Sequence, residues 1–376
     1  MILKKIKTEH TDKKTGMVLK RIETSEWETH NHKIAVNNSL FNCEKMRIDN
    51  KKPILNAHFQ INHIFFNKKK GIWNFDKMAE SKAHTSRIGR FYLPFQQRNA
   101  NQWEILTFQE AEADFQDLVT RGLSFVPYPI PLNADLEEWK ERKKDALTLL
   151  NPSQTLVAVF CSRHQRDLFE EIFNYEFEKS KVIGVQCYGL NDDDTLLNLM
   201  KIKARNQILQ TGDETPLLIG LNYEKVLRTL SCVSGNFAYS CFGFDVLSCR
   251  QMNMENMPTD VIRKMLSKEI EEIMKYDRVL GGFNHSAEQE FWDGINVTRA
   301  FLENVDVTQG LSPYQAIQWA NHREQQKDFD LLNEYILETA YDENALLNSI
   351  NNDKEKWAVF YKTKIVQLNQ GGENEL

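Results

Sequence analysis

A regular alternation of apolar runs and amphipathic segments occupies the middle of the chain and limits the folds that it can adopt. Short apolar runs such as Thr155 to Cys161 (TLVAVFC) alternate with stretches whose apolar residues recur at helical spacing. Strands buried on both faces have this near-continuous apolar composition, and parallel strands need a connection long enough to hold a helix. The pattern therefore predicts repeated β-α units around a parallel sheet.

The predicted units follow one another without a break. We expect strands over residues 123–130, 155–161, 181–187, 216–221 and 236–245, and helices over 108–121, 135–150, 165–178, 195–209 and 223–232. The chain has no GxGxxG or GxxxxGK[ST] loop that would indicate an open nucleotide-binding sheet. These features favour an α/β fold of the (β/α)8 TIM-like barrel type.

Composition divides the chain into four predicted parts. Residues 1–85 form a basic, β-rich N-terminal segment, residues 86–257 the core barrel units, residues 258–365 a helical region that completes or caps the barrel, and residues 366–376 a disordered tail. The helices predicted in the third part cover residues 259–276, 287–304, 314–326, 330–341 and 342–350.

Charge is distributed unevenly along the chain. Residues 1–100 carry 20 Lys and Arg against 9 Asp and Glu, although the whole chain has a net charge of −6. A basic strip with aromatic neighbours could bind a polyanion such as DNA or RNA. The nucleic-acid-binding residues that we predict on this basis are Lys68, Lys69, Lys70, Arg87 and Arg90. A solvated lysine-rich surface explains the same charge without a ligand.

Other classes of protein are disfavoured. The chain has no run of about 18 apolar residues that could span a bilayer and no apolar secretion signal, so we expect a cytoplasmic protein with no membrane partner. Its six cysteines form no CxxC pair and no zinc-ligand spacing, which predicts reduced thiols and no metal site. The pattern does not decide whether the chain forms a homodimer.

Candidate binding residues follow from the barrel prediction, because barrel enzymes gather their functional side chains at the carboxyl ends of the strands. The substrate-binding candidates at the predicted strand ends are mainly amide and hydroxyl groups: Gln96, Gln97, Tyr128, Ser162, Gln186, Tyr188 and Asn222. Such groups suit the donor and acceptor edges of a heterocycle better than a hard metal ion.

Asp245 and Arg250 are the candidate catalytic residues. Asp245 ends the last predicted apolar strand, where a carboxylate is costly to bury, and Arg250 follows it. A structural ion pair between the two is the alternative interpretation.

The order of these segments resembles the queuine/archaeosine tRNA-guanine transglycosylase superfamily. The family motifs FGIVQGG, GYAIGGLSVGE and PRYLMGVG correspond to LVAVFCSR, KVIGVQCYGLND and PLLIGLN, and its PEDLLEAV and GVDMFDCVLPTR correspond to YEKVLRTL and NFAYSCFGFDVLSCR. In this alignment Phe244 and Asp245 fall on the FD pair of the family. Arg250 falls on its arginine, with one residue fewer between them.

The resemblance implies a barrel that exchanges a guanine in DNA or RNA for a 7-deazaguanine, with Asp245 attacking the sugar C1′ to form a covalent intermediate. The zinc motif CxCxxC of the family is missing, so no cofactor is expected, and its DSGGFQ motif and second carboxylate are missing too. These differences point to a diverged member, such as one of the DNA-modifying branch. The alternatives are a catalytically degenerate barrel that binds nucleic acid and an unrelated TIM-barrel enzyme for a small metabolite.

Overall fold

The computed structural model describes most of the chain up to residue 285 and one helix beyond it. The described residues are 2–12, 15, 17–36, 58–67, 70–75, 78, 82, 89–227, 232–251, 257–268, 272–278, 280–285 and 313–338. The helices predicted at 287–304 and 342–350 and the tail at 366–376 lie outside them. No helix within the described ranges is long and apolar enough to cross a membrane.

The chain divides into two compact units. Unit 1 contains Met1–Asn38, Asn56–Tyr223 and Ser240–Gln251, and unit 2 contains Ser39–Leu55, Glu224–Tyr239 and Met252–Leu376. The boundary predicted at residue 85 therefore falls inside unit 1, and the boundary predicted at residue 257 falls inside unit 2.

A six-stranded, fully parallel sheet is the centre of unit 1, as the β-α pattern predicted. Its strand order is β4-β15-β12-β11-β10-β9. The bounds are β4 (Lys33–Ile34), β9 (Phe125–Pro129), β10 (Thr155–Cys161), β11 (Val182–Gln186), β12 (Leu217–Tyr223) and β15 (Val246–Cys249). Almost every residue of these strands is buried, which explains their continuous apolar composition.

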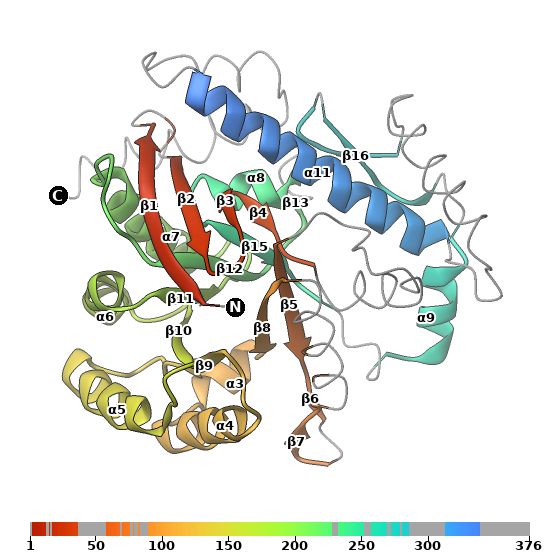
Figure 1. The fold of residues 1–376 in the computed structure, drawn as a ribbon. Helices are drawn as coiled ribbons and strands as arrows, with labels where there is room; N and C mark the ends of the chain where they lie inside the picture. Colours follow the sequence, from red (N-terminus) through yellow and green to blue (C-terminus); the bar gives the residue numbers. More distant parts are fainter. Residues whose placement is uncertain are drawn as a thin grey trace. The chain divides into compact units, whose positions relative to one another are not determined.

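Helices precede β9 and follow β9, β10 and β11, and they cover one side of the sheet (Figure 1). They are α3 (Ala100–Glu104), α4 (Phe108–Thr120), α5 (Leu136–Leu149), α6 (Arg166–Lys179) and α7 (Asp193–Gln207). Polar side chains cap all of them but α6: for example, Thr107 and Glu110 form a capping box on α4, and Asp192 accepts the backbone N–H of Thr195 at the start of α7.

A second parallel pair continues the arrangement beyond the edge at β4. β5 (Phe59–Ile64) and β8 (Phe91–Gln96) pair in parallel along their whole length. Just after β4, the Val36 N–H donates to the Phe59 carbonyl, and the Ile61 N–H donates to the Val36 carbonyl. At the other side of this pair, the rings of Phe91 and Phe125 stack with centroids 3.8 Å apart.

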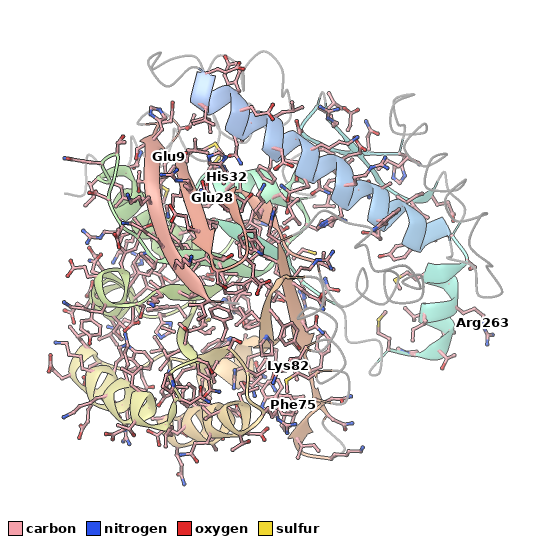
Figure 2. The ribbon with its side chains drawn as sticks, viewed as in Figure 1. Glu9, Glu28, His32, Phe75, Lys82 and Arg263 are labelled. Carbon is pink, nitrogen blue, oxygen red and sulfur yellow. The ribbon has the colours of Figure 1, made fainter. Side chains whose placement is uncertain are left out.

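Antiparallel strands complete the described part of unit 1. β1 (Leu3–Thr11), β2 (Val18–Thr24) and β3 (Glu28–His30) form a three-stranded sheet, and β6 (Phe66–Asn67) pairs with β7 (Ile72–Trp73). Arg21 on β2 forms ion pairs with Glu9 and Glu28, whose side chains are labelled in Figure 2. The first strands are thus tied together partly by surface charge.

The described residues of unit 2 form a small antiparallel sheet and three helices. Its sheet has the order β13-β14-β17-β16, with β13 (Val226–Leu227), β14 (Val233–Ser234), β16 (Lys275–Asp277) and β17 (Gly282–Asn284). Its helices are α9 (Thr259–Leu266), α11 (Pro313–Glu338) and most of α8 (Gly235–Ser240). The Tyr276 hydroxyl on β16 donates to Asp328 on α11 at 2.6 Å.

The predictions for the described residues between 223 and 245 are wrong in type. Residues 223–232 were expected to be helical, but β12 runs to Tyr223 and residues 226–227 form β13. Residues 236–245 were expected to be a strand, but they contain α8 and a turn, and β15 begins only at Val246. A short helix buried on all sides has the same continuous apolar composition as a buried strand, so the pattern could not separate them.

Two predictions in the C-terminal region need correction as well. The helix expected over 259–276 ends at Leu266, and residues 275–277 form a strand. The helices expected over 314–326 and 330–341 are one helix through residue 338. Gln326 donates to Asp330 across the expected break, and such i, i+4 contacts support a continuous helix.

Gly243 in the turn before β15 provides a test of this packing. Its φ is +91°, and a Cβ atom there would lie 2.6 Å from Asn206 Nδ2. Gly212 has a similar φ of +98° but no atom within 4 Å of its Cβ position. We expect Gly243→Ala to lower the free energy of unfolding by about 3 kcal/mol and Gly212→Ala by about 1 kcal/mol, measured by urea denaturation. Equal losses would show that Asn206 does not crowd this turn.

Candidate functional site

Asp245 lies at the amino end of β15, not at the carboxyl end of a strand as predicted. The physical reason is the position of β15, which starts one residue after Asp245. The Asp245 carboxylate is fully buried and accepts hydrogen bonds from Lys20 Nζ at 3.2 Å, Asn31 Nδ2 at 3.1 Å and the Leu218 N–H at 2.8 Å. Its backbone carbonyl accepts from the Lys33 N–H.

The partner of Asp245 in an ion pair is Lys20, not Arg250. Both side chains of the pair are fully buried, with Lys20 Nζ 3.1 Å from Asp245 Oδ1. Burial raises the pKa of the Asp245 carboxyl, and the charge of Lys20 acts against that rise. Arg250 is exposed and follows β15 at its other end. The two predicted catalytic residues are therefore separated by the length of the strand.

A chain of three uncharged side chains lies at the carboxyl ends of the strands. Ser248 Oγ on β15 is 2.9 Å from His63 Nε2 on β5, and His63 Nδ1 is 2.7 Å from Gln97 Oε1, just after β8. Gln97 Nε2 donates to the Gln251 carbonyl at 3.2 Å. Ser248 and His63 are buried, whereas Gln97 is partly exposed.

The position of each proton in this chain follows from its contacts. Because the Gln97 amide nitrogen faces the Gln251 carbonyl, its oxygen faces His63 and must accept from the Nδ1–H. His63 Nε2 therefore carries a lone pair, and the Ser248 hydroxyl donates to it. Burial lowers the pKa of His63 to about 4, so the ring is neutral at neutral pH.

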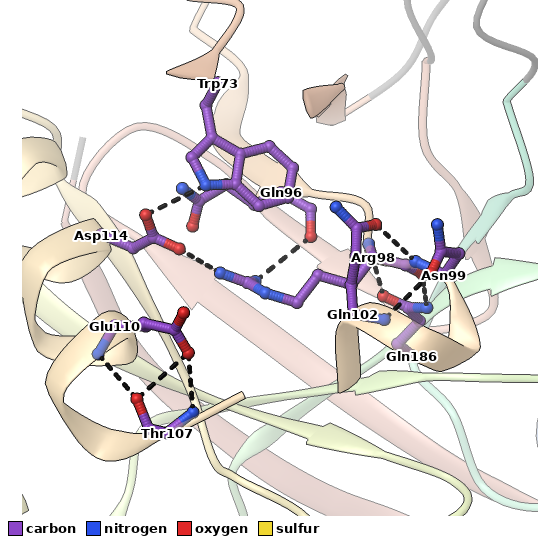
Figure 3. A network of polar contacts seen from close by, with 9 residues as sticks. All are labelled: Trp73, Gln96, Arg98, Asn99, Gln102, Thr107, Glu110, Asp114 and Gln186. Carbon is purple, nitrogen blue, oxygen red and sulfur yellow. Dashed lines mark hydrogen bonds and ion pairs between the residues drawn. The ribbon is translucent and has the colours of Figure 1, made fainter. Parts of the chain in front are cut away.

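Gln186 connects β11 to the segment that follows β8 (Figure 3). Its Nε2 donates to the Arg98 carbonyl at 2.6 Å, and its Oε1 accepts from the Arg98 N–H at 3.3 Å. The same Nε2 lies 3.2 Å from the Tyr188 hydroxyl, which donates to the Arg98 carbonyl. Two predicted binding residues, Gln186 and Tyr188, thus meet at one point.

Arg98 is held in place from several sides. Its guanidinium forms an ion pair with Asp114 on α4 and lies 4.9 Å from the ring centroid of Trp73 and 5.6 Å from that of Trp103. The Trp73 indole N–H donates to Asp114 at 3.0 Å, and Gln96 lies beside them (Figure 3). The ion pair with Asp114 neutralises the buried charge of Arg98. The contacts of its side chain hold the backbone of Arg98 in place, and this backbone binds the Gln186 amide.

Tyr188 is the partly exposed aromatic residue of this group. The Arg163 guanidinium lies 4.6 Å from its ring centroid and forms an ion pair with Asp192. The charge of Arg250 is near enough to lower the pKa of Tyr188, although burial has the larger effect and raises it. Ser162 accepts from the Tyr188 N–H at 3.1 Å and so positions its backbone.

The other predicted binding residues have different surroundings. Tyr128 points to the helices, between Phe115 on α4 and Trp139 on α5, and so lies apart from the chain of Ser248 and His63. Asn222 lies at the carboxyl end of β12 with a φ of +61°, in an irregularity of the pairing with β15. Its buried side-chain oxygen has no hydrogen-bond partner among the described residues.

The predicted nucleic-acid strip is only partly described. Lys68, Lys69 and Arg87 lie outside the described residues, and Lys70 is exposed. Arg90 is only 3% exposed, which leaves its side chain inside the protein rather than on a contact surface. Two aromatic residues near the strip contact arginines of the protein itself: Trp73 packs on Arg98, and Phe75, labelled in Figure 2, packs on Arg121.

Sequence reasoning missed His63, Ser248 and Arg98. His63 lies in an apolar run over residues 54–66 within the segment that was assigned to a separate N-terminal part, so its strand was not counted with the others. Ser248 was hidden by the misplacement of the last strand. Recognising FQINHI as a buried strand would have placed His63 near a strand end.

No protein-family model and no curated protein matches this chain. Within the described ranges, no group of three or more His, Cys, Asp or Glu side chains is arranged to hold a metal ion.

The buried His63 gives the protein a predictable pH dependence. The folded-state pKa is about 4 and the ordinary value is 6.5, so between these values the unfolded chain binds a proton that the folded protein excludes. This contribution to stability is complete above pH 6.5 and is lost as the pH falls to 4, by up to about 3 kcal/mol. His63→Gln should lose less stability than the wild type over this window in urea denaturation. Identical pH slopes would contradict the burial of a neutral ring.

Proposed function

We propose that unit 1 is a closed (β/α)8 barrel that binds a nucleobase at the carboxyl ends of its strands. The strand order supports closure. The strands β4, β5, β8, β9, β10, β11, β12 and β15 neighbour one another in chain order, and their backbone pairings are parallel. The stacked rings of Phe91 and Phe125 join β8 to β9, which are not paired through their backbones.

Side-chain contacts at the carboxyl ends also support closure. His63 on β5 reaches Ser248 on β15, and Gln186 on β11 reaches the backbone of Arg98 after β8. β8 belongs to the pair with β5, whereas β11 lies between β10 and β12 in the six-stranded sheet. Contacts between strands that are not neighbours are expected where strand ends surround a common axis.

The position of Ser248 changes how the family resemblance applies. The family motif GVDMFDC also fits residues 243–249 (GFDVLSC) without a gap, and this alignment puts Asp245 on its first aspartate and Ser248 on its second. The ungapped alignment agrees with the location of Asp245 at the amino end of β15 and Ser248 nearer the carboxyl end. The function proposed for this protein therefore involves no covalent intermediate between Asp245 and a sugar. Exchange of a guanine for a 7-deazaguanine would need another nucleophile.

Tyr188 is the observation on which the binding proposal mainly rests. Its partly exposed ring lies beside the neutral amide of Gln186, with the cationic side chains of Arg163 and Arg250 near it. An aromatic face suits stacking with a base, amide groups suit its polar edges, and arginines suit a phosphate. A nucleotide, alone or within DNA or RNA, combines these three features.

Tyr188→Ala tests this function against a matched control. Tyr175 on α6 is also partly exposed and also lies near cations, with Lys140 and Lys143 Nζ 5.5 and 5.2 Å from its ring centroid. Loss of one base–aromatic stack should weaken the binding of guanosine monophosphate and 7-deazaguanine about tenfold in Tyr188→Ala, measured by calorimetry. Tyr175→Ala should bind like the wild type. Absence of binding by the wild type, or equal effects of the two changes, would refute the proposal.

A further inference from the structure

The chain of Ser248, His63 and Gln97 has a consequence that is independent of base binding. Its distances of 2.9 and 2.7 Å match those between a nucleophile, its base and the group that orients the base. The three side chains come from different places in the sequence: β15, β5 and the segment after β8. Such a constellation is recognised by geometry and roles, not by order in the chain.

The direction of the hydrogen bonds is the one that activates a hydroxyl. The Ser248 O–H points to a lone pair on His63, whose other nitrogen is fixed as N–H by Gln97, and Gln97 is itself fixed by the Gln251 carbonyl. Reversing one bond would leave two donors or two acceptors facing each other.

Charge and burial fit the same role. The charged groups nearest in sequence to this chain are Arg98 and Arg250; Arg98 is neutralised by Asp114 and Arg250 is exposed. The neutral imidazole presents the Nε2 lone pair to the Ser248 hydroxyl, and an amide in the third position orients the ring without adding charge.

We infer that Ser248 is a nucleophile activated by His63, for small carboxylic esters. Ser248 Oγ attacks the carbonyl carbon while its proton passes to His63 Nε2. The carbon–oxygen bond to the alcohol then breaks, and the alcohol leaves with the proton from His63. Water, deprotonated by the same nitrogen, attacks the acyl group and releases the acid and Ser248. Ester and water thus give acid and alcohol, and no electrons are transferred.

A small alkyl fluorophosphonate tests this on the full chain. The Ser248 oxygen forms a bond to phosphorus, and the phosphorus–fluorine bond breaks. Fluoride leaves, and His63 takes up the proton of the Ser248 hydroxyl. We expect peptide mass spectrometry to find the label on Ser248. Ser162 is an internal control, since it is equally buried at a strand end but contacts Thr195 and the Tyr188 N–H instead of an imidazole.

Two variants separate activation from simple exposure of the serine. Gln97→Leu, at a partly exposed position, should slow labelling of Ser248 about tenfold by removing the hydrogen bond that orients His63. Ser248→Ala should remove the label. Failure of the wild type to be labelled, equal labelling of Ser162, or an unchanged rate in Gln97→Leu would overturn the inference. None of these results depends on whether the protein binds a nucleobase.

Discussion

One buried ion pair fixes the amino end of the central sheet. The Asp245 carboxylate joins β15 to β2 through Lys20 and to β12 through the Leu218 N–H, while its carbonyl receives the Lys33 N–H of β4. A buried charge left without its partner destabilises a protein by about 3 to 5 kcal/mol, so each of these groups depends on the others. The register of β15 between β12 and β4 follows from this arrangement.

The carboxyl end of β15, opposite the ion pair, carries the side chains that we propose to be reactive. Ser248 is three residues beyond Asp245 and meets a neutral histidine rather than a charge. The two ends thus differ in kind: the amino end holds a closed ion pair, and the carboxyl end holds uncharged donors and acceptors with arginines at its exposed margin. This division agrees with the general location of sites at the carboxyl ends of parallel strands.

The sequence predicted the parts of the fold that depend on local pattern. The strands predicted at 155–161 and 181–187 and the helix predicted between them at 165–178 were found because two apolar runs flank a segment with helical spacing of apolar residues. Gln186, Tyr188 and Gln97 were found because they lie at the predicted ends of strands. Asp245 was misplaced because α8 is short and its described side chains are buried, and nothing in a local pattern distinguishes such a helix from a strand. His63 was missed because its contact with Ser248 spans 185 residues.

The most direct test of this division is the behaviour of Asp245→Asn. The change keeps the shape of the side chain but leaves Lys20 buried without its counter-charge, and it leaves the carboxyl ends of the strands untouched. We predict a loss of about 3 kcal/mol in the free energy of unfolding, and an unchanged affinity of the folded protein for guanosine monophosphate. A variant with full stability but no affinity for the nucleotide would contradict this account, because Asp245 would then serve the ligand and not the fold.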